Sequence, residues 1–237
     1  MKISRTGFVF VACVLCVVLA EAAPVPQWIS GDTLAPEKPA PVLERTFSLS
    51  AVPSNAVFGI AVAGWCEVSV NGRKAGSDVL SPVTCQPDHR LSRVRFDVTG
   101  LLGAGENKIC VLLGNGWFNC FTKCSWKFAE AAWRAAPQIR GRLTVEGQTV
   151  LVTDGSWRAY DSPIVFNALR NGEWYDARLE GTRPHERAAK VEKYSPAGCE
   201  SPEIAVPCRE FETFEPVRTL RSPDALFLYT TNRSPSR

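Results

Sequence analysis

Hydrophobic and polar residues alternate in several short runs along the middle of the chain. The alternation is clear at residues 46–50, 66–70 and 94–98. Successive side chains of a β-strand point to opposite faces of a sheet, so this period indicates strands with one buried face. Two further runs, 56–63 and 108–113, are apolar enough to be buried strands. We therefore predict a domain built mainly from short strands.

Turn signals separate these predicted strands. Asn71-Gly72 directly follows the run at 66–70, and both central residues of a type I′ hairpin turn need a positive φ. Gly147 lies between residues 140–145 and 149–153, which predicts a second hairpin. Short strands joined by such turns indicate an all-β fold, a jelly-roll β-sandwich.

Helical signals are weak throughout the chain. One or two turns of helix are expected at residues 130–136, where Pro137 would end them. No longer amphipathic period is found in the sequence, so helices contribute little to the predicted fold.

The first 22 residues have the pattern of a secretory signal peptide. Lys2 and Arg5 precede an apolar run at 7–19, and Ala20-Glu21-Ala22 places small residues at the −3 and −1 positions of a cleavage site. The apolar run is short for a membrane span. We expect a cleaved leader, a secreted or periplasmic protein and no stable membrane anchor, with a retained anchor as the alternative.

Composition divides the rest of the chain into three parts. Residues 23–41 are rich in proline and are expected to form an extended lead-in. Residues 42–180 contain the clear strand patterns and form the predicted sandwich. Residues 181–237 are expected to be a linker and the start of a second β-domain, with weak strand patterns at 211–214 and 225–229.

Charge and aromatic content narrow the class of partner. The 237 residues carry a formal net charge of +3, and Lys and Arg are scattered rather than concentrated on one predicted face. This argues against nucleic acid as a partner. The seven tryptophans are compatible with core packing and with a surface that stacks on sugar rings.

Nine cysteines are present, and seven remain once the leader is removed. In an exported chain these can form disulfides, and an odd number leaves at least one unpaired. The two local candidate pairs are Cys120 with Cys124 and Cys199 with Cys208. A zinc site is disfavoured because the only two histidines, His89 and His185, lie far from any cysteine pair in the sequence.

The segment 171–178, NGEWYDAR, is the strongest candidate for acid–base chemistry. Most glycosidases use two carboxyl groups that flank the scissile bond. Glu173 and Asp176 are three residues apart, so in a strand they point to opposite faces. We instead expect Asp176 and Arg178, two residues apart, to form a structural pair. The prediction is that the chain has no catalytic residues.

Sugar binding is the competing interpretation. It requires an aromatic platform with a few planar polar side chains, and sometimes a calcium ion. The sequence places suitable residue types after one predicted strand and in the 171–178 segment. The candidate carbohydrate-binding residues are Asn115, Trp117, Glu173, Trp174, Tyr175 and Arg178.

Several short sequence motifs in this chain occur in a recognisable order. They are VSVNGRK at 68–74, FDVTGLL at 96–102, GENKICVLLGNGW at 105–117, TDGSW at 153–157 and NGEWYDAR at 171–178. Together they resemble the N-terminal domain of bacterial α-L-rhamnosidases over residues 42–178. The resemblance implies a galactose-binding-like sandwich that assists substrate recognition. It also implies that the family's inverting hydrolysis takes place in a separate helical domain, which this chain lacks.

The resemblance further implies a Ca²⁺ ion, for which Asn71 is the candidate ligand. Expected partners are a rhamnose-containing oligo- or polysaccharide, or a glycosidase catalytic domain. Three hypotheses follow: a secreted non-catalytic carbohydrate-recognition domain, a purely structural domain that supports a catalytic partner, and an enzyme in its own right. The first is favoured.

Overall fold

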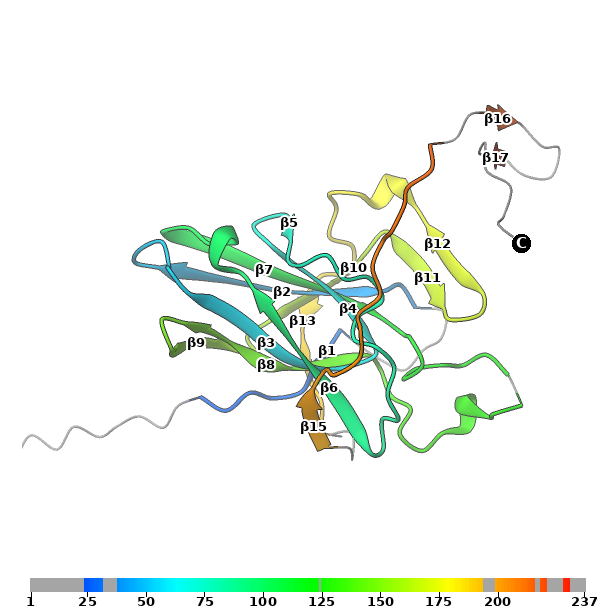
Figure 1. The fold of residues 1–237 in the computed structure, drawn as a ribbon, viewed down its shortest axis with the longest axis horizontal. Coiled ribbons are helices and arrows are strands. Elements are labelled where there is room, and N and C mark those ends of the chain that lie inside the picture. The colour runs from blue at the N-terminus through cyan, green and yellow to red at the C-terminus, as the bar shows by residue number, and fades with distance from the viewer. Residues whose placement is uncertain are drawn as a thin grey trace, which may run out of the picture.

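Two β-sheets face each other and enclose a hydrophobic core (Figure 1). The computed structural model describes residues 24–31, 38–123, 125–193 and 199–215, and the backbone of strands β16 (Arg218–Leu220) and β17 (Leu228–Thr230). The predicted leader at 1–22 therefore lies outside the described residues. Among those described, no helix has the length and apolar character needed to cross a membrane.

The first sheet has the strand order β14-β1-β8-β3-β6-β15, with β9 also paired to β8. Neighbouring strands are antiparallel except β15, which runs parallel to β6. Its strands are β1 (Ile29–Ser30), β3 (Ala56–Ala63), β6 (Arg90–Asp97), β8 (Gln138–Val145), β9 (Gln148–Val152), β14 (Lys190–Val191) and β15 (Cys199–Pro202).

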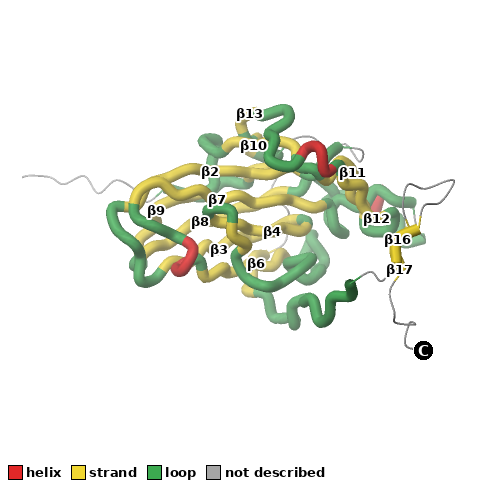
Figure 2. The backbone as a smooth tube through the Cα atoms, turned by 90° about the horizontal axis from the view of Figure 1, so that it is seen from above, coloured by secondary structure: helices red, strands yellow, loops and turns green. Residues whose placement is uncertain are grey.

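The second sheet has the order β13-β10-β2-β7-β4-β5. Its strands are β2 (Pro41–Leu49), β4 (Trp65–Val70), β5 (Arg73–Lys74), β7 (Gly105–Gly114), β10 (Arg158–Asp161) and β13 (Arg187–Ala188). Seen from above, the long strands run roughly along the long axis of the sandwich (Figure 2). The fold is the predicted all-β jelly-roll β-sandwich.

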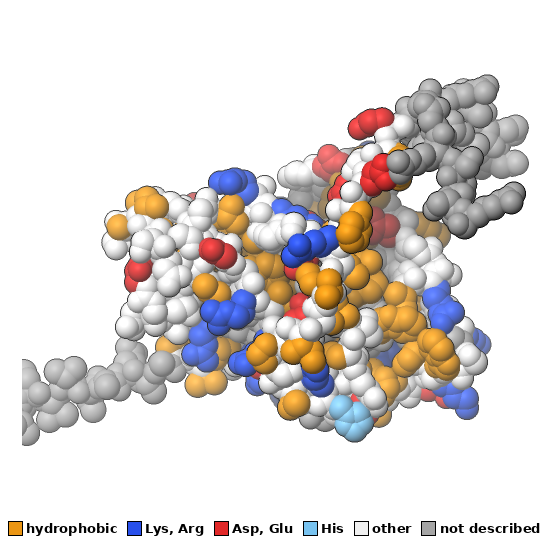
Figure 3. Space-filling model, in the orientation of Figure 1, with side chains coloured by type: hydrophobic (Ala, Val, Ile, Leu, Met, Phe, Trp, Pro, Cys, Tyr) orange, Lys and Arg blue, Asp and Glu red, His pale blue; other side chains and the backbone are white. Residues whose placement is uncertain are grey.

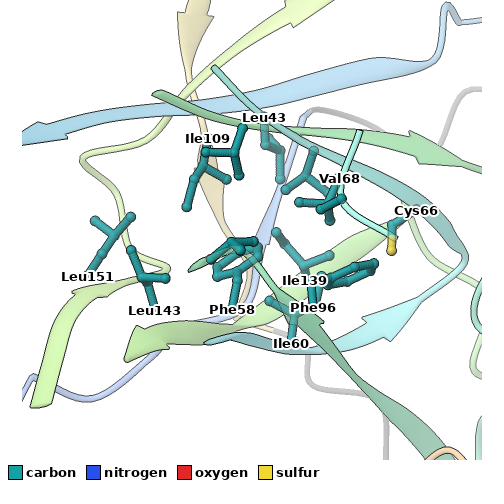
Figure 4. Packing of buried hydrophobic residues seen from close by; sticks show 14 of the residues in the cluster. Leu43, Phe58, Ile60, Cys66, Val68, Phe96, Ile109, Ile139, Leu143 and Leu151 are labelled. Atoms are coloured by element: carbon teal, nitrogen blue, oxygen red, sulfur yellow. The ribbon is translucent and has the colours of Figure 1, made fainter. Parts of the chain in front are cut away.

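The core fills the space between the two sheets. Figure 4 shows side chains of β3 and β8, such as Phe58 and Leu143, pointing toward Leu43 of β2 and Ile109 of β7. All four of these side chains are fully buried. Trp157, also fully buried, stacks on Phe58 with ring centroids 6.3 Å apart. The period-2 pattern of the sequence therefore marks the core-facing positions correctly.

Most of the predicted strands and turns are confirmed. The five runs of the central region fall in β2, β3, β4, β6 and β7, and 140–153 forms the β8–β9 hairpin. Asn71 and Gly72 have φ of 52° and 79°, as the predicted hairpin turn between β4 and β5 requires. Residues 211–214 form no strand, which corrects that prediction. Most of 225–229 lies outside the described residues.

The helix predicted at 130–136 is wrong. A single 3₁₀ turn at Phe128–Glu130 is followed by irregular backbone. The Arg134 guanidinium donates to Ala129 O at 3.1 Å and to Asn119 Oδ1 at 3.0 Å, and Trp133 packs against the outer face of the first sheet. These tertiary contacts hold residues 115–123 and 125–137 as an irregular insertion, because packing outweighs a weak local helix preference.

The sandwich extends past both predicted boundaries. Within the predicted lead-in, β1 is fully buried and pairs with β8 and β14. Within the predicted linker, β13, β14 and β15 pair with β10, β1 and β6. After β15, residues 203–215 continue as an extended strap across the surface, which Figure 1 shows in orange. Both end segments complete the sheets rather than only connecting them.

Candidate functional site

A short hairpin extends from one end of the sandwich. Its strands are β11 (Ile164–Ala168) and β12 (Gly172–Tyr175), which pair only with each other (Figure 1). Phe166 is opposite Trp174, and Asn167 is opposite Glu173. Since side chains alternate along a strand, the two pairs lie on opposite faces of the hairpin. Glu173 and Trp174, both candidate carbohydrate-binding residues, therefore lie on different faces of the hairpin.

Asparagines fix this hairpin to the sandwich. The backbone N–H of Asn115 donates to Asn167 Oδ1, and Asn115 Nδ2 donates to Asn167 O, both at 2.8 Å. Asn119 Nδ2 in turn donates to Asn115 Oδ1 at 2.7 Å. Asn115 is 7% exposed, so these bonds form largely away from water. The predicted binding residue Asn115 therefore positions the hairpin through Asn167.

An apolar cleft of about 450 Å³ lies between the Asn167–Glu173 face of the hairpin and the ends of β4 and β7. Its lining includes Trp65, Leu112, Ile164 and Ala168, with the carboxylates of Glu67 and Glu173. Lys74 Nζ is 2.6 Å from Glu67 Oε2, while Glu173 has no ion pair or hydrogen bond within the described residues. The cleft thus combines an aromatic ring, aliphatic side chains and one unpaired carboxylate.

The ring of Trp65 rests on the chain at Gly116. This residue has φ of 51°, and a Cβ placed there would be 3.2 Å from the Trp65 ring. A glycine is suited to both constraints, because a side chain would strain the backbone and displace the indole. The sequence GNG at 114–116 thus shapes one wall of the apolar cleft.

Aromatic side chains cover the opposite face of the hairpin and the insertion beside it. Trp174 packs on Phe166 at 5.0 Å between ring centroids, and Phe166 packs on Phe121 at 6.0 Å. In the insertion, Trp117 contacts Trp126 at 6.1 Å. These residues, together with Phe128 at 5.1 Å from Trp117, form what we call the aromatic surface.

Arg170 and Asn171 join the hairpin turn to the insertion. The guanidinium carbon of Arg170 lies 6.0 Å from the ring centroid of Trp117 and 5.8 Å from that of Trp126. Thr122 Oγ1 donates to Asn171 Oδ1 at 2.9 Å. Trp126 and Trp174 remain 65% and 66% exposed. The aromatic surface therefore presents two open indoles that a ligand could contact.

The segment NGEWYDAR ends in the expected ion pair. Arg178 Nε and Nη2 donate to the two carboxylate oxygens of Asp176 at 2.8 and 2.6 Å. Asp176 also accepts from the Arg178 N–H at 3.1 Å and so caps a 3₁₀ turn at Ala177–Leu179. These hydrogen bonds lower the pKa of Asp176 to about 2. The Asp176 carboxylate and the Arg178 guanidinium thus form a local structural pair.

Tyr175, the remaining candidate in this segment, is also engaged locally. Its hydroxyl donates to Glu180 Oε1 at 2.7 Å, and this bond raises the pKa of Tyr175. The ring itself is 54% exposed. Tyr175 can offer its face to a ligand, whereas its hydroxyl already has a partner.

Asn71, the proposed calcium ligand, has a structural role. Its Oδ1 accepts from Lys108 N at 2.9 Å, and its Nδ2 donates to Leu101 O and to Asn107 Oδ1, each at 2.9 Å. These bonds hold the β4–β5 turn against the start of β7. Across the described residues, no three His, Cys, Asp or Glu side chains are grouped so as to hold a metal ion.

The two histidines differ in position, because His185 lines a hollow of about 310 Å³ together with Asn115 and Asn167, whereas His89 does not. His185 Nδ1 is 2.8 Å from Asp161 Oδ2, and the imidazole is 81% exposed. His89 is exposed and lies 3.8 Å from the Asp88 carboxylate. Neither ring faces a nucleophile or a second base in the contacts of the described chain.

The cysteines differ strongly in accessibility. Cys199 and Cys208 are both exposed and both free, so the disulfide predicted between them is not formed in this structure. Cys120 is buried, and its proposed partner Cys124 lies outside the described residues. Cys66 is buried in the core, and burial raises the pKa of its thiol to about 12.

This difference predicts selective alkylation. In the freshly reduced native protein at pH 8, we expect iodoacetamide to modify Cys199 and Cys208 and to leave Cys66 unmodified. Thiolates are the reactive form, and Cys66 is both protonated and enclosed. Peptide mass spectrometry measures each site, with a urea-unfolded sample as the control in which Cys66 reacts. Equal labelling of Cys66 in the native and unfolded protein would contradict the assigned burial.

Comparisons with known proteins identify the sandwich and its hairpin. The family model described as the alpha-L-rhamnosidase N-terminal domain matches residues 51–218. An alpha-L-rhamnosidase of Formosa agariphila is 32% identical over 141 residues, which are 56% of this chain and 15% of that protein. The matched residues include the two apolar strand runs, 56–63 and 108–113, and the β11–β12 hairpin.

Solved structures agree with this assignment. An alpha-L-rhamnosidase from Dictyoglomus thermophilum superimposes with a TM-score of 0.69 at 26% identity, covering 86% of this chain and 25% of that one. The Streptomyces avermitilis alpha-L-rhamnosidase complexed with L-rhamnose gives 0.65 at 25% identity, covering 81% of this chain and 20% of that one.

The fold and the hairpin define a β-sandwich domain of the kind found in glycoside hydrolases. More narrowly, the chain belongs to the alpha-L-rhamnosidase N-terminal domain family. It spans less than a fifth of the length of the curated relatives it matches.

Proposed function

We propose that this chain is an exported, non-catalytic domain of an α-L-rhamnosidase that binds rhamnose-containing glycans. The apolar cleft carries this proposal. L-Rhamnose is a 6-deoxy sugar, so it presents a methyl group as well as hydroxyls. Trp65 and the aliphatic lining of the cleft suit the methyl and the C–H faces of the ring, and the unpaired Glu173 carboxylate can accept from hydroxyls.

The aromatic surface supports the same function. Trp174 is exposed on the far face of the hairpin, and Trp126 is exposed on the insertion. Further sugar rings of a longer glycan could stack on both. Tyr175 adds an exposed ring on β12. The aromatic surface, on the opposite face of the hairpin from the cleft, would thus be a second contact for a longer glycan.

Calorimetric titration with L-rhamnose and with L-mannose tests the proposal. L-Mannose differs only in a hydroxyl at C6, so it removes the methyl contact and leaves the other groups unchanged. We expect L-rhamnose to bind roughly tenfold more tightly, because a methyl group in an apolar site contributes about 1–2 kcal/mol. Titrations with Ca²⁺ and with a chelator show whether a calcium ion contributes.

The variant Glu173→Ala is expected to weaken L-rhamnose binding roughly tenfold, since the sugar hydroxyls lose a charged acceptor. Glu106→Ala removes an equally exposed carboxylate from β7 outside the cleft and is the matched control. Binding of neither sugar by the wild-type chain, with or without calcium, would refute the carbohydrate-recognition proposal.

We also expect no release of rhamnose from an aryl rhamnoside by this chain. Glycosidases typically use two carboxyl groups. In the apolar cleft, Glu67 is held by Lys74 at 2.6 Å, which leaves Glu173 alone. Measurable release that is abolished by Glu173→Ala would instead make the chain an enzyme.

A structural role is the second candidate function, and the strap favours it. Ile204, Val206 and Phe211 are 77%, 89% and 98% exposed along this segment. Figure 3 shows hydrophobic side chains gathered where the strap crosses the sandwich. Val79 N donates to Cys208 O at 2.9 Å, which holds the strap in place. This apolar edge suits a partner domain such as the catalytic part of a rhamnosidase, and Phe211→Ser would weaken that association without affecting L-rhamnose binding.

A further inference from the structure

The outer face of the first sheet carries two pairs of arginines around a strand with small side chains. In the register of the sheet, Gly59 of β3 is opposite Arg95 of β6 on one side and Arg142 of β8 on the other. One step along, Ala61 is likewise between Arg93 and Arg140. The core-facing residues Phe58 and Ile60 alternate with Gly59 and Ala61, so all four arginines lie on the outer face.

Gly59 and three of the four arginines border a groove. A hollow of about 480 Å³ is lined by Gly59, Arg93, Arg95, Arg142 and Thr144, with Pro202 of β15 at one side. A Cβ placed on Gly59 would meet no atom within 4 Å, so the space above this glycine is open. Strands β6 and β8 are each about 4.8 Å from β3, which separates the two arginine rows by roughly 10 Å. We call this the arginine groove.

Among the described residues, three of the four guanidinium groups have no acidic partner. Arg140 is paired with Glu200 and lies 5.2 Å from the ring centroid of Trp28. In contrast, Arg93, Arg95 and Arg142 are exposed and make no side-chain hydrogen bond or ion pair within the described chain. Asp97, the nearest acidic residue along β6, has its carboxylate bonded to Thr99 N at 3.0 Å. The described lining of the groove therefore contains three arginines and no acidic residue.

Such a cluster is unfavourable without an anion. Like charges gathered on one face repel each other within about a Debye length, and glycine in the middle of a strand weakens pairing. Both features become favourable if an anionic group lies over Gly59, because planar guanidinium groups bind oxyanions in a bidentate manner. Glycine in a strand also marks positions where a ligand approaches the backbone closely.

We propose that the arginine groove is a binding site for an anionic polysaccharide, which it contacts through sulfate or carboxylate groups on the glycan. The site lies on the outer face of the first sheet, whereas the apolar cleft lies beside β4 and β7 of the second sheet. The groove accordingly recognises charge at a place separate from the proposed rhamnose site. Its function does not depend on the apolar cleft.

A polysaccharide fits the groove better than a nucleic acid. Single-stranded nucleic acids are usually bound by basic grooves with aromatic side chains that stack on bases. The described residues that line the arginine groove include no aromatic ring. Three arginines around Gly59 offer charge without a base-stacking platform.

Binding of defined polymers tests this site in the full chain. Dextran sulfate and polygalacturonate are the anionic probes, neutral dextran is the uncharged control, and a single-stranded oligonucleotide tests the other polymer class. We expect one or both anionic polysaccharides to bind and neutral dextran not to bind. Binding should be lost by about 0.5 M NaCl, where charges more than about 4 Å apart are screened.

Two kinds of variant locate the interaction. The double substitution Arg95→Gln with Arg142→Gln is expected to lower affinity for the bound anionic polymer more than tenfold, since two charge-assisted contacts are lost. Gly59→Val is expected to weaken binding by filling the floor, and the residue has the open space to accept it. Arg73→Gln, on β5 of the second sheet, removes one positive charge elsewhere and should leave affinity within about twofold, whereas Arg95→Gln or Arg142→Gln alone, each with the same charge change, should weaken binding further.

Three results would overturn the proposal. The first is the absence of binding to both anionic polysaccharides at low salt. The second is equal loss of affinity in the Arg73→Gln control and in the double variant, which would indicate a non-specific charge effect. The third is tighter binding of the oligonucleotide than of either polysaccharide, which would assign the groove to nucleic acid. L-Rhamnose titrations of the same variants report separately on the apolar cleft.

Discussion

Replacing Trp157 with Ala is expected to lower the free energy of unfolding by about 3–5 kcal/mol, the range for truncating a large buried aromatic side chain. Trp157 is fully buried between the two sheets and stacks on Phe58 at an interplanar angle of 19°. Its Nε1–H also donates to Val152 O at 2.9 Å. The substitution would leave a cavity in the core and remove the partner of a buried carbonyl.

Urea unfolding monitored by circular dichroism measures this effect. Trp174→Ala is the control, because Trp174 is 66% exposed and its loss should change stability by less than about 1 kcal/mol. Trp157→Phe should be intermediate, since it keeps most of the ring volume and loses the hydrogen bond. A loss below about 1 kcal/mol in Trp157→Ala would show that the two sheets do not pack around this residue.

Sequence patterns predict this core well and its edges poorly. The alternation in residues 66–70 and 94–98 marks inward positions such as Val68 and Phe96, because a half-buried strand imposes a period of two. The short pairings of β1 and β15 carry no such period, since they contain only two and four residues. They are held by pairing with strands that are distant in the sequence. Local sequence patterns do not reveal such pairing.

The candidate sites show the same division between local and long-range information. The Asp176–Arg178 pair was predictable because both residues belong to one short segment. The separation of Glu173 from Trp174 was predictable in principle from strand alternation, once β12 is recognised as a strand. The apolar cleft was not, because Trp65, Leu112 and Ile164 come together only through the tertiary fold.

The arginine groove explains why scattered charge in the sequence did not indicate a basic site. Arg93 and Arg95 are adjacent outer positions of β6, and Arg140 and Arg142 are adjacent outer positions of β8. Each R-x-R pattern alone is ordinary for a solvated strand face. Their clustering depends on β3 lying between β6 and β8, which is a property of sheet order rather than of local sequence.

Replacing Asn167 with Ala is expected to weaken L-rhamnose binding roughly tenfold while leaving the sandwich core intact. Asn167 Oδ1 is the acceptor for the buried Asn115 N–H, and a buried donor without a partner costs about 1–3 kcal/mol. The hairpin has no strand pairing with either main sheet. The lost hydrogen bond therefore weakens the attachment of the hairpin to the sandwich. Glu173 and the lining residues Ile164 and Ala168 would move with it.

Calorimetry with L-rhamnose and hydrogen exchange of the β12 amides test this positioning role together. Asn167→Ala should increase exchange in β12 without changing exchange in the core strands β3 and β7. Asn167→Asp keeps an oxygen acceptor for Asn115 N–H and should restore most of the affinity. Asn171→Ala, which removes only the acceptor for Thr122 Oγ1 at an exposed turn, is the matched control. If Asn167→Ala accelerates β12 exchange but leaves affinity unchanged, L-rhamnose does not bind between the hairpin and the sandwich, and the apolar cleft is not the sugar site.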